Sequence, residues 1–461
     1  MAIAATPLLL ACGGGSPGAP GAIASAQCSG PTCPVQGPPP QGAGAAPLCP
    51  ATADIGSSTY LGGAGSGEVV RLNINAVAMT YTLTWLESPI PAQPVNVQPT
   101  RQGVSISGVV SHPPTGFLPT AEQTRCAFIL QPATGTTPAG GTTPYSTTST
   151  FNAQNPPMIL IGQGGVAGGG IPGAEISFPG TPNPLDPTNI VFPVPDRIFD
   201  FYPFIGFATT DSTLADLQGT YNALAYHIRP SDTYGAIGVN AVETFDATGN
   251  CTSPTACITT GGSATGGTPW TPVASSGYFT STNAPQLLPP PSVTLGSLVF
   301  PFSPQSPAYM ILGKVNGTLV PVVVRAGIAD PANLAVDDES GIAMLAPATA
   351  VASGGIDGGY VGADSNFKYT ATLIKGGSAS FVNPSTATAE SSFALQYGLS
   401  SPGLVGATDA QANPGFVIAA GGLYAVLLQG VENGGITASS AIIGQPTSSV
   451  PYFGIGAQIS K

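Results

Sequence analysis

Apolar and polar side chains alternate along much of this chain. Residues 70–74 read Val-Arg-Leu-Asn-Ile, and residues 79–85 read Met-Thr-Tyr-Thr-Leu-Thr-Trp. A period of two puts every second side chain on the same face of a strand. The two segments therefore predict a hairpin with one buried face. Shorter apolar runs at 104–107, 126–130 and 158–162 predict further strands.

Two other hairpins are indicated by their turn residues. Asn316-Gly317 and Gly421-Gly422 each stand between apolar runs. Asn and Gly tolerate the positive φ angles that two-residue hairpin turns require. Pro321 follows the first turn and cannot donate a ladder hydrogen bond, so it predicts an edge strand or a bulge.

Helical features are rare. Residues 211–218 could form a short helical turn capped by Asp211 or Ser212, and residues 386–398 are an alternative helix. The pattern predicts a mainly β fold with very little helix. We expect antiparallel sheets that form sandwich or barrel units joined by long Gly/Pro-rich loops.

Composition divides the chain into four segments. Residues 13–52 have almost no large apolar side chains, and residues 171–200 are a proline-rich and aromatic strap that proline keeps extended. The expected divisions are a signal-peptide remnant (1–11), a disordered tether (12–52), an N-terminal β unit (53–200) and a C-terminal β region (201–461).

The C-terminal region opens with a pattern seen in small barrels. Gly219, Thr220 and Tyr221 resemble the first strand of lipocalin-like and avidin-like barrels. The resemblance implies a barrel that binds a small apolar ligand, with a lining that would include Tyr221, Tyr226, His227 and Trp270. The alternative is that these side chains simply fill a core.

The charge of the chain excludes some partners. Only 7% of the 461 residues are charged, and the net charge is −12 with ten Lys and Arg. Ten basic residues cannot build the patch that nucleic acid needs, nor can they dock the chain on anionic lipid. No apolar run reaches the 18 or more residues of a spanning helix.

The N-terminus carries a different membrane signal. Leu9-Leu10-Ala11-Cys12 resembles the lipobox of bacterial lipoproteins, and a Gly-rich segment follows it. The resemblance implies that Cys12 is acylated and becomes the new N-terminus, held on the membrane by its acyl chains. Because Gly13 and not Asp follows, it implies an outer-membrane destination. Only eleven residues without a basic start precede Cys12, so we expect the true start upstream or a truncated signal.

The number of cysteines agrees with lipidation. Seven is odd, and a lipid on Cys12 leaves six that can pair. Fifteen connectivities are open; spacing favours two local loops and one long link, namely Cys28–Cys33, Cys251–Cys257 and Cys49–Cys126. Zinc is less favoured because no C-x₂-C pair is present. Three disulfides would place the protein in the periplasm or beyond.

Catalytic signatures are weak. The single G-x-S-x-G match, at residues 14–18, lies in the tether and not on a strand-to-helix turn. His112 and His227 are the two side chains that could act as a histidine base, so a secreted hydrolase with a non-standard site remains an alternative. A surface or hydrogen-bonded role is the simpler interpretation of each histidine.

One acidic cluster is a candidate metal site. Asp337, Asp338 and Glu339 are adjacent, and Asp330 precedes them by seven residues. Such oxygen ligands suit Ca²⁺, but the spacing matches no EF-hand loop. A solvated loop is the alternative, and we expect no other cofactor.

Taken together, the lipobox, the cysteines, the strap around residues 199–204 and the strand opening at 217–221 resemble one family. It comprises Gly/Pro-rich lipoproteins of Gram-negative bacteria, catalogued as a domain of unknown function, and the resemblance spans residues ~50–461. The family implies no activity and no catalytic residues. The leading expectation is an exported, lipid-anchored cell-envelope protein of the outer membrane, whose partner is the membrane itself and whose role is structural or binding.

Overall fold

The computed structural model describes residues 49–460. The internal gaps in the description are 94–95, 119–120, 148–155, 174, 179–181, 184–185, 191–193, 199–200, 230–234, 254–256, 260–269, 283, 289–291, 296–297, 302–305, 331–334, 367–368, 384–387 and 430–450. The predictions for Cys12, Cys28 and Cys33 lie outside the described residues. In the described part, no helix is both long and apolar enough to cross a membrane.

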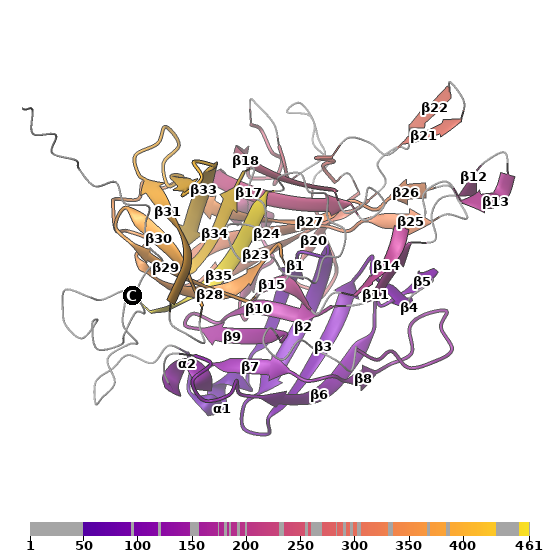
Figure 1. Cartoon of the computed structure of the whole chain (residues 1–461), viewed down its shortest axis with the longest axis horizontal. Coiled ribbons are helices and arrows are strands. Elements are labelled where there is room, and N and C mark those ends of the chain that lie inside the picture. Colours follow the sequence, from indigo (N-terminus) through magenta and orange to yellow (C-terminus); the bar gives the residue numbers. More distant parts are fainter. Residues whose placement is uncertain are drawn as a thin grey trace, which may run out of the picture.

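Strands form nearly all of the regular structure in the described part (Figure 1). The helical elements there are short: α1 (Thr52–Ile55), α2 (Ala121–Arg125) and the 3-10 helix η2 (Leu214–Leu217). The mainly β prediction is confirmed, and η2 confirms the helical turn expected at 211–218. The expected cap is wrong, because the N-cap residue is Thr213 and not Asp211 or Ser212. The alternative helix at 386–398 is wrong, because Thr388–Gln396 is strand β31, paired on both sides.

The N-terminal unit is a closed barrel. Its eight strands follow the order β3-β2-β1-β15-β10-β9-β7-β6, and pairing of β3 with β6 closes the ring. Their bounds are β1 (Thr59–Ala64), β2 (Glu68–Asn75), β3 (Thr80–Glu87), β6 (Ser105–Ser111), β7 (Ala127–Leu130), β9 (Met158–Gly162), β10 (Val166–Pro172) and β15 (Phe201–Phe207), and the short β8 (Thr134–Gly135) adds to β6. The predicted hairpin is β2–β3, with Leu72 opposite Leu83.

A middle sheet follows in the chain. Its order is β18-β17-β27-β24-β23-β20-β19, with β16 also paired to β23. The strands are β16 (Thr210–Asp211), β17 (Gly219–Arg229), β18 (Gly235–Phe245), β19 (Thr271–Pro272), β20 (Phe279–Ser281), β23 (Ala308–Val315), β24 (Thr318–Arg325) and β27 (Ser340–Pro347). The hairpin β23–β24 turns at Asn316 and Gly317, whose φ angles are 49° and 78°, as predicted. Strand β24 is interior rather than at an edge, and Pro321 lies just before the residues that pair with β27.

The C-terminal unit is a second closed barrel, in which each strand pairs with the next and β35 returns to β28. The predicted Gly421-Gly422 turn joins two of its strands. The strands are β28 (Gly358–Asp364), β29 (Tyr369–Lys375), β30 (Ser378–Asn383), β31 (Thr388–Gln396), β32 (Val405–Asp409), β33 (Pro414–Ala420), β34 (Leu423–Leu428) and β35 (Tyr452–Ser460). Its inward side chains form an apolar cluster that includes Phe381, Phe393 and Tyr424.

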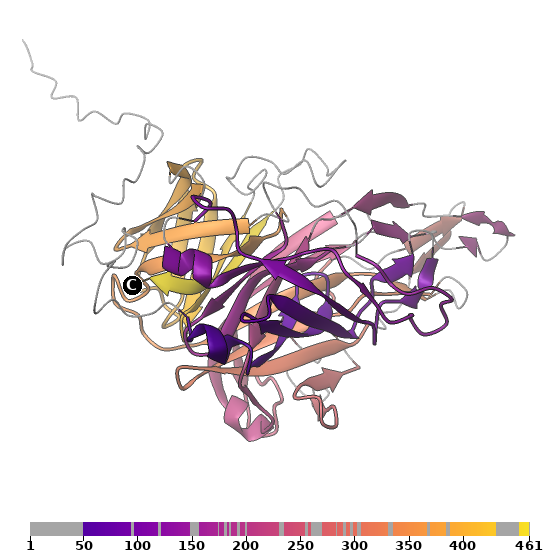
Figure 2. The same cartoon turned by 90° about the horizontal axis from the view of Figure 1, so that it is seen from below.

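Five small two-stranded sheets gather at one end of the molecule (Figures 1 and 2). They come from both the N-terminal and the middle part of the chain. The pairs are β4 (Pro91–Gln93) with β5 (Asn96–Thr100), β11 (Glu175–Phe178) with β14 (Val194–Ile198), β12 (Pro182–Asn183) with β13 (Asp186–Ile190), β21 (Ser292–Leu295) with β22 (Leu298–Pro301), and β25 (Ile328–Asp330) with β26 (Ala335–Asp337).

The predicted segment boundaries differ from the structure in three places. Strand β15 belongs to the first barrel, where it lies between β1 and β10, so the division at 200/201 comes too early. The region after it starts with the middle sheet, and its closed barrel lies at the end and not at the start. The predicted tether boundary at residue 52 is too late, because Cys49 is fully buried and α1 begins at Thr52.

The three units share one hydrophobic core. A single cluster of buried residues includes side chains from both barrels and from one face of the middle sheet. Glycines let the backbones approach closely: a Cβ on Gly168 of β10 would lie 3.3 Å from the Cβ of Ala457 on β35. The units are therefore packed as a continuous body (Figure 2), with a second cluster on the other face of the middle sheet.

Gly63 provides a test of this packing. A Cβ at this position in β1 would lie 2.6 Å from Cγ1 of Val324 in β24, and valine is stiff at χ1. We expect Gly63→Ala to destabilise the protein by about 1–3 kcal/mol through overpacking. Gly377→Ala is the matched control, because its Cβ would meet only one atom, at 3.9 Å. Equal urea midpoints for the two variants would contradict the close approach.

Candidate functional site

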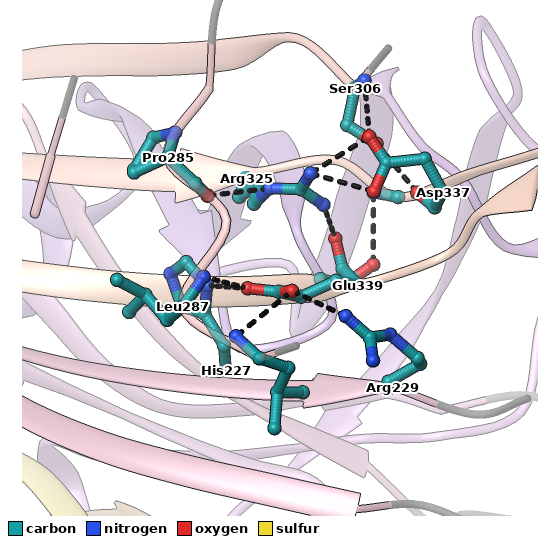
Figure 3. A network of polar contacts seen from close by, with 11 residues as sticks. His227, Arg229, Pro285, Leu287, Ser306, Arg325, Asp337 and Glu339 are labelled. Carbon is teal, nitrogen blue, oxygen red and sulfur yellow. Dashed lines mark hydrogen bonds and ion pairs between the residues drawn. The ribbon is translucent and has the colours of Figure 1, made fainter. Parts of the chain in front are cut away.

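The densest group of buried charges lies at one end of the middle sheet. Strand β17 ends in His227 and Arg229, β24 ends in Arg325, and Asp337 and Glu339 precede β27 (Figure 3). All five side chains are at most 3% exposed. Because alternate residues of a strand share a face, His227, Arg229 and Arg325 lie on the face that carries the second apolar cluster. The two carboxylates pair with them there.

Glu339 is the centre of the first half of the network. Its Oε1 lies 2.7 Å from Nδ1 of His227, and its Oε2 accepts a hydrogen bond from Arg229 at 3.0 Å. The backbone N–H groups of Leu287 and Leu288 donate to the same carboxylate at 2.8 and 3.3 Å. The carboxylate therefore attaches the segment around residue 287 to the strand ends.

Gly341 makes room for the imidazole. It lies opposite His227 in the β17–β27 ladder, and a Cβ there would be only 2.1 Å from Cδ2 of the ring. Any side chain at this position would displace His227 from Glu339. The glycine is thus required by the geometry of the network.

Arg325 is the centre of the second half. Its guanidinium donates to both oxygens of Asp337, at 2.7 and 2.8 Å, and to the backbone carbonyl of Glu339. Its Nε donates to the carbonyl of Pro285 at 2.8 Å. Ser306 completes this half, because its N–H donates to Asp337 Oδ2 at 2.8 Å.

Burial sets the protonation states. Desolvation lowers the pKa of His227, against the raising effect of Glu339, so the imidazole is neutral at neutral pH. Desolvation would raise the pKa of Glu339, but the hydrogen bond from His227 and the positive charge of Arg325 hold it below its ordinary value. Neutral His227 then donates its Nδ1 proton to an ionised carboxylate, which fixes the tautomer.

The whole network lies within a region of the chain that matches a known family. The model of a family described as a protein of unknown function, DUF2957, matches residues 80–457. The chain belongs to the DUF2957 family. No curated protein matches it. The matched residues run from β3 of the first barrel to β35 of the second. The family match therefore includes most of the first barrel, the middle sheet and the second barrel.

The predicted ligand-binding residues do not share one surface in this DUF2957 chain. Tyr221 and Tyr226 lie on opposite faces of β17, because they are five positions apart and side chains alternate between the two faces of a strand. Tyr226 stacks on Phe453 of the second barrel, with ring centroids 6.0 Å apart. Trp270 and Tyr221 are buried together in the second apolar cluster. These aromatic side chains contribute to core packing.

Two of the predicted metal ligands already have protein donors as partners. Asp337 and Glu339 accept hydrogen bonds from arginine, histidine and backbone donors, and Asp338 is 2% exposed. Asp330 ends β25, and its side chain is outside the described residues. The solvated-loop alternative is wrong for residues 337–339, because they are buried. Calcium binding stays a prediction.

The histidines show two different environments. His112 Nδ1 lies 2.9 Å from the carbonyl of Ala127, and its ring packs on Phe128. His227 has the carboxylate partner of a catalytic histidine, but within the described part of the chain no serine hydroxyl is hydrogen-bonded to either ring. Serine hydrolases with a histidine base use that contact to activate the nucleophile.

Sequence reasoning missed another buried ion pair, which lies outside this network and joins Arg101 to Glu68 of the first barrel. Arg101 donates from Nε and Nη2 to the two oxygens of Glu68, both at 2.6 Å, and both residues are fully buried. The guanidinium carbon also lies 4.3 Å from the ring of Trp85. The sequence did contain a signal. Glu68 stands directly before an apolar strand in a chain with few charges, and a carboxylate that becomes buried there needs a cation to pair with.

Proposed function

We propose that this DUF2957 protein is an exported cell-envelope protein, held at the outer membrane by lipid on Cys12, with a structural or binding role. The observation that carries the proposal is the disulfide between Cys49 and Cys126. Disulfides persist in oxidising compartments, which supports export. The second disulfide, Cys251–Cys257, adds to this argument. Both pairings confirm those expected from the spacing.

The first disulfide lies where an anchored tether would meet the folded body. Cys49 is fully buried and linked to Cys126, next to strand β7. Arg125 donates to the carbonyls of Cys49 and Pro50, at 3.2 and 2.9 Å, and pairs with Glu122. A pull through residues 12–48 would therefore be carried by a covalent bond into the first barrel.

The arithmetic of the remaining cysteines supports the anchor. With four cysteines paired, Cys12, Cys28 and Cys33 remain. A local Cys28–Cys33 bridge leaves Cys12 as the odd residue, and it is the one in the lipobox. Lipid on Cys12 would leave no unpaired thiol.

The packing supports a scaffold. Eight-stranded barrels are just wide enough to be filled by side chains, and both barrels here have apolar clusters inside. The outer faces of these barrels pack against each other and against the middle sheet. Such a body presents surfaces and projecting hairpins to a partner.

Metabolic labelling with an alkyne fatty acid tests the anchor, using the full chain expressed from its native gene. We expect the wild-type protein to be labelled and to fractionate with the outer membrane. Cys12→Ser should lose the label and appear in the soluble fraction, because the acyl chains supply the membrane affinity. Cys28→Ser is the matched control and should keep the label. An unlabelled, soluble wild-type protein would overturn the proposal.

A further inference from the structure

The middle sheet has one long edge strand, β18. It pairs with β17 over eleven residues, and among the described strands it has no second ladder partner. Uncovered edges attract other strands, so proteins usually protect them. The first half of this edge is covered by the second barrel, because Gln429 donates to the carbonyl of Gly238 at 2.7 Å.

The second half is covered by the chain that follows β18. After the turn at 246–250, Cys251 forms a bridge with Phe245, and the N–H of Thr252 donates to the carbonyl of Thr244 at 2.7 Å. The hydroxyl of Ser253 donates to the carbonyl of Val242 at 2.5 Å. The segment thus occupies acceptors that a new strand would use.

A buried carboxylate holds the other end of this segment. Glu243 of β18 is fully buried and accepts hydrogen bonds from the N–H groups of Ile258 and Thr259, the latter at 3.0 Å. The hydroxyl of Thr259 donates to its second oxygen. The Cys251–Cys257 disulfide links these two attached parts of the chain covalently.

We propose that residues 251–253 and 257–259 form a redox-controlled latch, whose disulfide keeps the second half of the β18 edge covered and whose reduction uncovers it. Here the latch means these six residues. Cys251 is 3% exposed, whereas Cys257 is partly exposed, so Cys257 is the accessible sulfur.

The reaction needs a dithiol. One thiolate of the reductant attacks Sγ of Cys257, and Cys251 leaves as a thiolate. The second thiol of the reductant then attacks the mixed disulfide. The products are two protein thiols and the oxidised, cyclic reductant. The attachments at Thr252 and at Ile258–Thr259 become independent of each other.

Glu243 makes the latch sensitive to protons as well. Burial raises its pKa from 4.5 to about 7, against the lowering effect of its donors. Tyr221 is the titratable side chain opposite Glu243 on β17. Burial raises the pKa of this phenol to about 12, and the negative charge of Asp216 in η2 adds to the increase, so Tyr221 stays neutral. Between pH 4.5 and 7 the Glu243 carboxyl group is protonated in the closed latch and ionised in an open one. Opening therefore becomes easier as pH rises, by a factor on the order of a hundred.

Hydrogen exchange of the full-length protein tests the latch, with dithiothreitol as the reductant and mass spectrometry to confirm which disulfide is reduced. We expect reduction to speed exchange at Thr252, Ile258 and Thr259 by about tenfold or more, while the β17–β27 ladder stays protected. The Cys251→Ser/Cys257→Ser double variant should show the same fast exchange without reductant. Cys49→Ser/Cys126→Ser is the control and should keep the latch protected.

Two results would overturn the proposal. One is unchanged protection of these amides after Cys251–Cys257 is fully reduced. The other is equal loss of protection across the whole sheet, which would mean that the disulfide only adds global stability. The role of Glu243 is tested separately, by the pH dependence of exchange at the latch amides. After correction for intrinsic exchange, the opening equilibrium should increase from pH 5 to pH 7 in the wild type and stay constant in Glu243→Gln. A flat wild-type profile would remove the role of Glu243.

Discussion

Arg101→Met should destabilise the protein more than any surface substitution, by about 3–5 kcal/mol, because it leaves the Glu68 carboxylate buried without its cation. The guanidinium is fully buried and donates to both carboxylate oxygens at 2.6 Å. It also donates to Tyr145 Oη and to two backbone carbonyls, Pro172 and Gly173, at 3.1–3.2 Å. Methionine fills much of the volume but satisfies none of these acceptors.

Urea unfolding measures the effect as a shift of the midpoint. Lys314→Met is the matched control. Lys314 is 44% exposed and its partner Asp211 is 7% exposed, so solvent reaches the ammonium side of this pair, and we expect its loss to cost about 1 kcal/mol or less. The Glu68→Gln/Arg101→Met double variant should be less destabilised than the two single effects added together, since neither charge is then left alone. An Arg101→Met midpoint equal to that of Lys314→Met would contradict the burial of this pair.

Glu339→Gln should have the second largest effect, also about 3–5 kcal/mol. A neutral amide leaves Arg229 without its carboxylate and offers fewer acceptor positions to His227 and to the N–H groups of Leu287 and Leu288. We therefore expect the segment around Leu287 to lose its attachment to the strand ends. Faster hydrogen exchange at residues 287–288 should accompany the lower urea midpoint.

Glu122→Gln is the control for this second substitution. It makes the same chemical change in the Glu122–Arg125 pair, whose side chains are 28% exposed. Solvent screens that pair, so its loss should cost about 1 kcal/mol or less. The account of the network would fail if Glu339→Gln and Glu122→Gln lowered stability equally and exchange at residues 287–288 did not change.

The local features of the fold were predictable because they depend on neighbouring residues. The β2–β3 hairpin follows from alternation, and the turns at Asn316-Gly317 and Gly421-Gly422 follow from residues that tolerate positive φ. The disulfides followed from spacing and parity.

Features that depend on distant residues were not predictable. Nothing local shows that β15 inserts between β1 and β10, or that β35 returns to β28, because register between remote strands depends on the whole fold. The same holds for the charged network. The apolar run that ends in Arg325 signals a buried charge, but it does not identify Asp337 as the partner. Likewise, His227 and Glu339 are 112 residues apart in the chain.

The central claim is that an exported body is attached through Cys12, with every other cysteine paired. Intact mass spectrometry of protein from the membrane fraction, alkylated without prior reduction, tests it most directly. The account predicts a chain that begins at Cys12, carries the mass of its acyl chains, and takes up no alkylating reagent until it is reduced, when six cysteines react. A chain without acyl mass, with Cys12 alkylated before reduction, would contradict it.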